Sequence, residues 1–173
     1  PGTFGNSSQT TVDLTGATAF GLTFEAGAPA YSFTLGTNAS ATFAGSGVVN
    51  NSANVPVITV NGGDPFNVGG NLHLDLGTLG NARVDITTGR ASMTLGAGDG
   101  SSAAPSAGQA TINVTDGALW FRNASTGGNA TITTGATSGS ILFVDSSTAG
   151  NANITNTNTL LFEDASSAGN ATI

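Results

Sequence analysis

The sequence contains no cysteine and one histidine, and lysine and arginine together number only three among 173 residues. Without cysteine no disulfide can form, and the lone His73 cannot build a zinc site. The formal charge of −7 argues against nucleic-acid binding, which requires a basic surface. No apolar run of about 18 residues is present, so no membrane-spanning helix is predicted. We therefore expect no metal, no cofactor and no nucleic-acid partner.

Helical periodicity is absent as well, because no stretch repeats apolar residues every 3.6 positions. Apolar residues instead alternate with polar ones, as in residues 20–24, 71–76 and 81–86. Alternation at spacing two predicts β-strands with one buried face. Because 38% of the residues are apolar and many fall in such runs, we expect an ordered all-β chain.

The last third of the chain repeats one phrase three times, at residues 119–132, 141–154 and 160–173. Each copy carries a Phe followed by Gly-Asn-Ala, and the copies are offset by 22 and 19 residues. Such a period, with strand-like runs between turn residues, is typical of a solenoid. The sequence predicts a right-handed parallel β-solenoid (β-helix) with coils of about 19–22 residues, hence roughly eight or nine coils. We expect one domain, with degenerate repeats over residues 1–108 and clear repeats over 109–173.

The apolar residues of each copy fall in pairs at spacing two, so both members of a pair face the same side of a strand. Stacking of the copies should place Phe121, Phe143 and Phe162 inside the solenoid. Ile132 and Ile154 should line the facing wall of the same core.

Asn129, Asn151 and Asn170 follow a glycine in all three copies. Stacked coils would place them above one another, where their amides can form a hydrogen-bonded ladder. The alternative is that Asn is present only because it suits a turn. Both interpretations stay open at this stage.

Trp120, Leu142 and Leu161 lie between inward-facing residues of their strands and should therefore point outward. Three aligned apolar side chains, one of them the only Trp, would form an exposed stripe suited to lateral contact with another surface. The alternative is that the alternation slips at a corner and all three lie partly inside.

Candidate catalytic groups are few. Asp145 and Asp164 hold the same place in successive copies, but a pair of stacked turn carboxylates is more often solvated than catalytic. Residues 96–100 resemble half of a calcium-binding nonapeptide repeat, which needs stacked copies that are missing here. His73 should point outward, and no nucleophile-elbow pattern accompanies it. We assign no catalytic, metal-binding or cofactor-binding residue.

The phrase Phe-x-Asp/Asn-x-Ser/Thr-x-Ala/Gly-Gly-Asn-Ala-x-Ile is similar to repeats in the passenger regions of bacterial autotransporters. Residues 22–35 and 45–52 are similar to the segment that often precedes those repeats. The resemblance implies an exported β-solenoid at a Gram-negative cell surface. The chain departs from the usual pattern at Trp120, Leu142 and Leu161, where a polar residue such as Thr is more common. It starts without Met and stops in mid-phrase, so we expect a piece of a longer protein.

The favoured functional hypothesis is a non-enzymatic extracellular rod, structural or adhesive, either secreted or on the bacterial outer surface. We expect it to self-associate, head to tail or laterally, or to contact cell-surface glycans. One alternative is a carbohydrate-active β-helix enzyme, which needs two carboxylates in one groove. Another is a glycan- or ice-binding face, suggested by Thr155, Thr157 and Thr159. Against ice binding, Thr is not regular in the preceding copy and is simply a good strand residue.

Overall fold

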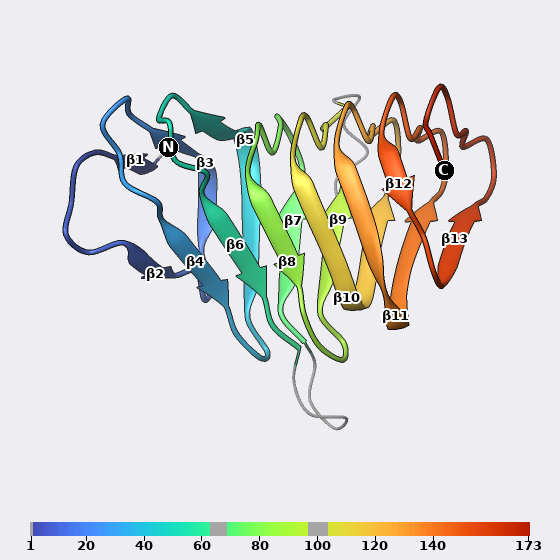
Figure 1. Cartoon of the computed structure of the whole chain (residues 1–173), viewed down its shortest axis with the longest axis horizontal. Coiled ribbons are helices and arrows are strands. Elements are labelled where there is room, and N and C mark those ends of the chain that lie inside the picture. The colour runs from blue at the N-terminus through green and yellow to red at the C-terminus, as the bar shows by residue number, and fades with distance from the viewer. Residues whose placement is uncertain (1, 63–68, 97–103) are drawn as a thin grey trace.

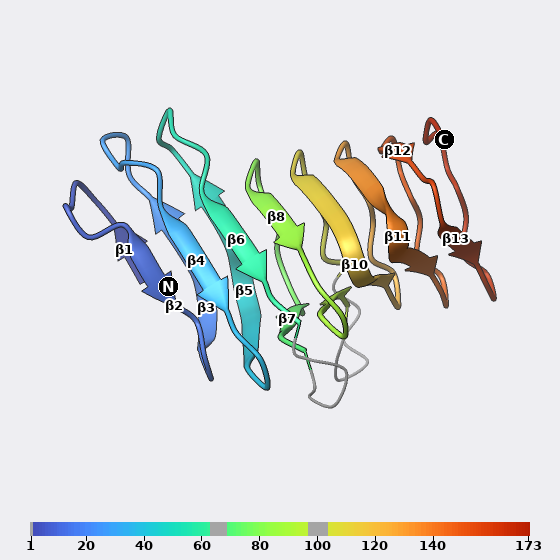
Figure 2. The ribbon, with the colours of Figure 1, turned by 60° about the horizontal axis from the view of Figure 1, so that its bottom comes forward.

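The computed structural model describes residues 2–62, 69–96 and 104–173, and within these residues it contains strands and turns but no helix. The coils stack along the long axis into a β-solenoid of about 7 turns, with the two termini at opposite ends (Figures 1 and 2). The predicted all-β parallel solenoid is thereby confirmed. Since the described part has no helix, it has none that is long and apolar enough to cross a membrane. The strands are β1 (Gly2–Phe4), β2 (Thr11–Asp13), β3 (Thr18–Phe24), β4 (Ser32–Leu35), β5 (Ser40–Asn50), β6 (Val57–Val60), β7 (Asn71–Leu74), β8 (Arg83–Ile86), β9 (Ser92–Leu95), β10 (Thr111–Phe121), β11 (Thr131–Phe143), β12 (Asn153–Thr155) and β13 (Thr159–Phe162).

The strands pair in parallel as three ladders, which we call wall 1, wall 2 and wall 3 in the order in which each coil visits them. Wall 1 stacks β2, β4, β6, β8, the first halves of β10 and β11, and β12. Wall 2 stacks the first halves of β3 and β5, then β7, β9, the second halves of β10 and β11, and β13. Wall 3 contains β1 and the second halves of β3 and β5, and continues as single bridges between turns. Because the strands between the two end coils pair with the coils before and after them, their backbone polar groups are satisfied between coils.

A turn motif beginning with Ser or Thr forms the narrow wall 3 of the later coils. The Oγ1 atom of Thr126 accepts a hydrogen bond from the N–H of Gly128 at 3.1 Å. Gly128 has a φ of 60°, in the left-handed region that glycine enters without steric cost. This geometry explains the glycine of the repeated phrase. The same bond joins Thr78 to Gly80, Ser106 to Gly108 and Thr148 to Gly150. The motif therefore begins at Thr78, earlier than the clear repeat in the sequence.

The core is a continuous apolar column enclosed by the three walls. The rings of Phe121 and Phe143 stack with centroids 4.4 Å apart, and those of Phe143 and Phe162 with centroids 4.8 Å apart. Phe121 and Phe143 are fully buried, and Ile132 and Ile154 line wall 1 of the same interior, as the spacing predicts. An aromatic cluster of Phe4, Phe24, Tyr31 and Phe33 fills the N-terminal coils.

Coil length varies along the rod, and this is where the structure differs from the expected 19–22 residues. The last coils keep that length, since Asn129 stacks on Asn151 22 residues later and Asn151 on Asn170 19 residues later. Coils in the middle of the rod are longer, because Asn50 contacts Asn81 across 31 residues, whereas the first coil pairs Gly2 with Leu22 and Thr11 with Ser32. The longer coils reduce the expected eight or nine coils to about 7 turns.

Candidate functional site

The outer side of wall 2 carries the row of residues that the sequence singles out. Trp120 is paired with Leu142 in the β10–β11 ladder, and Leu142 with Leu161 in the β11–β13 ladder. Their neighbours Phe121 and Phe143 are buried, so the alternation runs through these strands without a slip. Leu161 is 37% exposed, and Trp120 and Leu142 are partly exposed. We call these three residues the apolar row.

In the coils before Trp120, the positions that pair with the apolar row hold polar residues. Trp120 pairs with Thr94 of β9, and Thr94 pairs with His73 of β7. The parallel outer row, two positions earlier in each strand, is made of small and polar residues throughout. Its members are Ser40, Asn71, Ser92, Ala118, Ser140 and Thr159. Within this face of the rod, the change from polar to apolar therefore occurs at Trp120.

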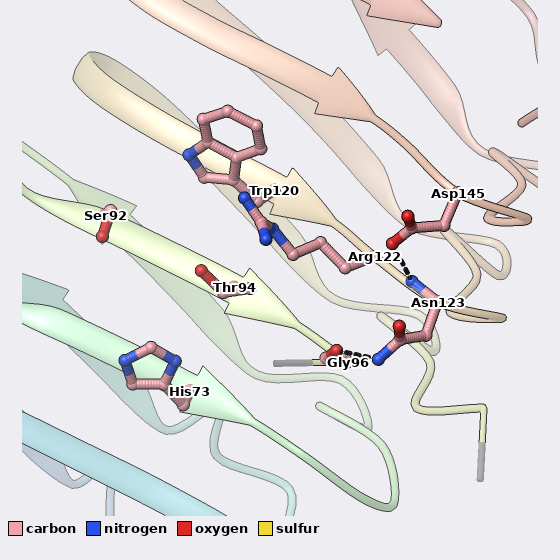
Figure 3. Close-up of a pocket in the computed structure, with 8 residues that line it drawn as sticks. All are labelled: His73, Ser92, Thr94, Gly96, Trp120, Arg122, Asn123 and Asp145. Carbon is pink, nitrogen blue, oxygen red and sulfur yellow. Dashed lines mark hydrogen bonds between the residues drawn. The ribbon is translucent and has the colours of Figure 1, made fainter. Parts of the chain in front are cut away.

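At that change lies a hollow of about 320 Å³, which we call the Trp120 groove (Figure 3). The guanidinium of Arg122 lies over the indole of Trp120, 4.9 Å from the ring centroid, in a cation–π contact. His73 comes from β7, and Ser92 and Thr94 come from β9. Asn123 and Asp145 lie together at one end of the groove. The lining residues are His73, Ser92, Thr94, Gly96, Trp120, Arg122, Asn123 and Asp145.

Asn123 and Asp145 belong to a stacked corner that follows wall 2. Asn123, Asp145 and Asp164 have φ values of 54°, 58° and 56°, a left-handed conformation that Asn and Asp tolerate better than most residues. Each aspartate also bonds to the coil before it. Asp145 Oδ2 accepts the N–H of Asn123 at 2.9 Å, and Asp164 Oδ2 accepts the N–H of Asp145 at 3.2 Å. The two carboxylates thus serve as acceptors for the corner backbone.

The side-chain amide of Asn123 reaches in the opposite direction along the stack. Its Nδ2 donates to the carbonyl oxygen of Gly96 in the preceding coil (Figure 3). Asn123 is therefore held from both sides, by Gly96 and by Asp145. This double attachment fixes the end of the Trp120 groove.

The three asparagines of the repeated phrase lie in one exposed column beside wall 3. Asn151 Nδ2 donates to Asn129 Oδ1 at 3.2 Å, and Asn170 Nδ2 donates to Asn151 Oδ1 at 3.4 Å. The backbone N–H of Asn129 also donates to Gly108 O at 2.8 Å. These bonds connect successive coils at the rod surface.

The outer side of wall 1 is richer in threonine, with Thr59, Asp85, Asn113, Thr133 and Thr155 in one row. Arg83 and Asp85 interrupt this face with an ion pair at 2.9 Å, beside a hollow of about 520 Å³. The threonines that suggested an ice-binding face do not share one surface. Thr155 lies on wall 1, Thr159 lies on wall 2, and Thr157 Oγ1 donates to Gly135 O at 3.1 Å.

Among the described residues, Asp116 and Asp13 have a lowered pKa, and neither lines the Trp120 groove. The hydroxyl of Ser138, followed by the backbone N–H of Gly89 at 2.8 Å, holds the pKa of Asp116 below its ordinary value. Asp116 thereby connects three coils at the corner between walls 1 and 2. At the N-terminal end, the hydroxyl and N–H of Thr15 lower the pKa of Asp13.

Among residues 2–62, 69–96 and 104–173 no cluster of three or more His, Asp or Glu side chains could hold a metal ion. The half-motif at residues 96–100 lies outside the described residues from position 97 onward.

Sequence reasoning missed the Trp120 groove. It treated His73 as an isolated outward residue and did not consider Arg122. The available signal was the short segment Trp120-Phe121-Arg122-Asn123, in which an arginine follows an outward aromatic residue by two positions at the end of a strand. The partners from β7 and β9 could not be added, because coil length changes between Thr94 and Trp120.

Comparison of the chain with protein-family models, with curated proteins and with solved structures gave no match in any of the three cases. The fold defines the class of protein, a parallel β-solenoid.

Proposed function

We propose that this chain is a non-enzymatic rod segment of an exported protein of the autotransporter-passenger type, with a structural or adhesive task at the bacterial outer surface. Its contact face is the outer side of wall 2, and the apolar row of Trp120, Leu142 and Leu161 mediates lateral association with a second copy.

The observation that carries this proposal is the contrast within wall 2. Three apolar side chains stand in register on one row, while the parallel row displays Ser, Thr, Asn and Ala. A single exposed apolar residue needs no explanation, but an aligned set is typical of a contact surface. The row is straight because the strands pair without a shift from Trp120 to Leu161.

The distribution of carboxylates supports a binding role over glycoside hydrolysis. A glycosidase places two carboxylates across one groove, about 5–10 Å apart. The Trp120 groove contains one carboxylate, Asp145, and the wall 1 hollow contains one, Asp85. Oδ2 of Asp145 is already an acceptor for the backbone of Asn123.

The association should be weak. Three side chains cover much less than the roughly 1,200 Å² buried in stable interfaces, so contact should be detectable only at high protein concentration. An isologous arrangement suits this face, because it sets the apolar row of one rod against the same row of the other.

The test is sedimentation velocity over a wide concentration range, comparing wild type with the triple variant Trp120→Thr, Leu142→Thr and Leu161→Thr. The proposal expects concentration-dependent self-association of wild type and its loss in the triple variant. Circular dichroism and the melting temperature should stay close to wild type, since all three side chains point outward.

The matched control is a triple variant of the wall 1 row, Asn113→Ser, Thr133→Ser and Thr155→Ser. It changes the same number of outward residues in three neighbouring coils and should leave association unchanged. A monomeric wild type at high concentration, or equal loss of association in both triple variants, would contradict the proposal.

A further inference from the structure

We propose that the Trp120 groove is a binding site for a neutral saccharide. The site goes beyond lateral association, because it lies on the N-terminal side of the apolar row and uses polar groups that the row does not contain. It is formed by one copy of the chain, so a monomer should bind. Because Trp120 belongs both to the groove and to the apolar row, saccharide binding and lateral association should compete for its indole.

The first argument is size and composition. Small-molecule sites in proteins have volumes of about 300–1,000 Å³ and combine an apolar surface with a few polar groups that orient the ligand. The Trp120 groove, at about 320 Å³, is at the lower end of this range. It offers the partly exposed indole of the chain's only Trp, with the guanidinium of Arg122 over one face of the ring.

The second argument is the hydrogen-bonding character of the lining groups. Asp145 accepts only and Arg122 donates only, while the hydroxyl of Thr94 can do both. The hydroxyl of Ser92 donates its proton to Asn71 Oδ1 and therefore offers a ligand an acceptor. A ligand that satisfies all of them must itself donate and accept at neighbouring positions. Sugar hydroxyl groups do this, and the part of the indole that the Arg122 guanidinium leaves open offers a flat apolar surface to the C–H groups of a sugar ring.

The third argument is charge. An anionic ligand would meet Asp145 in the groove and a net charge of −7 on the whole chain. A cationic ligand would meet Arg122. Among the described residues the ion pair joins Arg83 to Asp85 on wall 1, so Arg122 forms no ion pair with a described carboxylate. A neutral ligand with hydroxyl groups avoids both repulsions.

The fourth argument is that the polar end of the site is already in place. The carboxylate of Asp145 is held in position, because its Oδ2 accepts a hydrogen bond from the Asn123 N–H at 2.9 Å. An ionised carboxylate has about four acceptor positions, so Asp145 keeps acceptor capacity for a ligand hydroxyl. Asn123 is itself fixed by its bond to Gly96. Binding therefore requires little reordering, which favours affinity.

The experiment is a fluorescence titration of the full chain. Trp120 is the only Trp, so the tryptophan emission reports on the surroundings of this one indole, and titration at low protein concentration keeps lateral association out of the signal. The probes are neutral di- to tetrasaccharides of glucose, galactose, mannose and N-acetylglucosamine, with sialyllactose and oligogalacturonate as acidic counterparts. The proposal expects a saturable change with at least one neutral probe. It also expects Asp145→Asn and Arg122→Gln each to weaken that binding about tenfold or more, as loss of a hydrogen bond to a charged group does.

Two control variants match these substitutions in chemistry but lie outside the groove. Asp164→Asn changes the equivalent corner residue one coil later, and Arg83→Gln changes a guanidinium on wall 1. Both should bind the neutral probe like wild type. The double variant Leu142→Thr and Leu161→Thr should also bind, even where it no longer associates laterally, and this separates the groove from the apolar row.

Three results would overturn the proposal. The first is no saturable change with any neutral probe up to about 10 mM, beyond the range of useful saccharide affinity. The second is binding of the acidic probes only. The third is neutral binding that neither Asp145→Asn nor Arg122→Gln weakens. If Asp145→Asn does not fold, Arg122→Gln decides alone, since Arg122 is exposed and lies just after the end of β10.

Discussion

Replacing Phe143 with Ala tests the stacked core most sharply. The side chain is fully buried, and its ring lies between Phe121 at 4.4 Å and Phe162 at 4.8 Å, nearly parallel to both. Phe-to-Ala changes in cores cost about 3–5 kcal/mol. Each aromatic pair adds about 0.5–1.5 kcal/mol beyond burial, and two pairs are lost here, so we expect the upper part of that range.

A second substitution separates ring stacking from volume. Phe143→Leu keeps most of the apolar bulk but loses both ring pairs, so it should cost about 1–3 kcal/mol. Equilibrium unfolding in urea, followed by circular dichroism and by the fluorescence of Trp120, gives both free energies. The control is Phe20→Ala, because Phe20 is 68% exposed and should cost no more than about 0.5 kcal/mol. Equal losses for Phe143→Ala and Phe20→Ala would refute the coil register.

Three further outcomes follow from contacts between coils. Gly139→Ala would place a Cβ 2.1 Å from Val114 O, so the free energy of unfolding should fall by more than about 1 kcal/mol in urea titrations. Asn151→Ala removes two exposed side-chain hydrogen bonds and should lower the free energy of unfolding by about 0.5–1.5 kcal/mol in the same assay. An unchanged free energy of unfolding would mean that Asn is present only because it suits the turn. Because the pKa of Asp116 is lowered in the folded chain, its carboxylate stabilises the fold above about pH 3.9, and this stabilisation is lost as the pH falls through the folded-state pKa. The stability difference between wild type and Asp116→Ala, measured by thermal melts, should therefore be largest near neutral pH and shrink in acid.

The sequence was sufficient to predict the C-terminal coils in some detail. Because the three phrases around Phe121, Phe143 and Phe162 differ by only a few residues in length, aligning them is the same as stacking them. The inward and outward positions then follow from strand alternation. This is why the buried Phe column and the outward direction of Trp120 both follow from the sequence alone.

The stacking of the longer coils could not be predicted from the sequence, because the register between coils depends on turn lengths. The coil that connects Asn50 with Asn81 is 31 residues long, and nothing in the local sequence marks which residues stack across it. The same difficulty separates Thr94 from Trp120, so the Trp120 groove could not be assembled. The bond from the Asn123 backbone to Asp145 was hidden for a related reason, since 22 residues separate the two. A corner aspartate looks like a local turn residue until its neighbouring coil is placed beside it.

The central claim, that the outer side of wall 2 is a lateral contact surface, is tested most directly by single-cysteine cross-linking. The chain has no cysteine, so any disulfide in a Leu142→Cys variant must join two copies. Leu142 is the middle of the apolar row, and an isologous contact brings it close to its own symmetry mate. Thr133→Cys, outward on wall 1, is the matched control. Under mild oxidation the account predicts a covalent dimer for Leu142→Cys and a monomer for Thr133→Cys. Equal dimer yields, or no dimer from Leu142→Cys at high concentration, would contradict it.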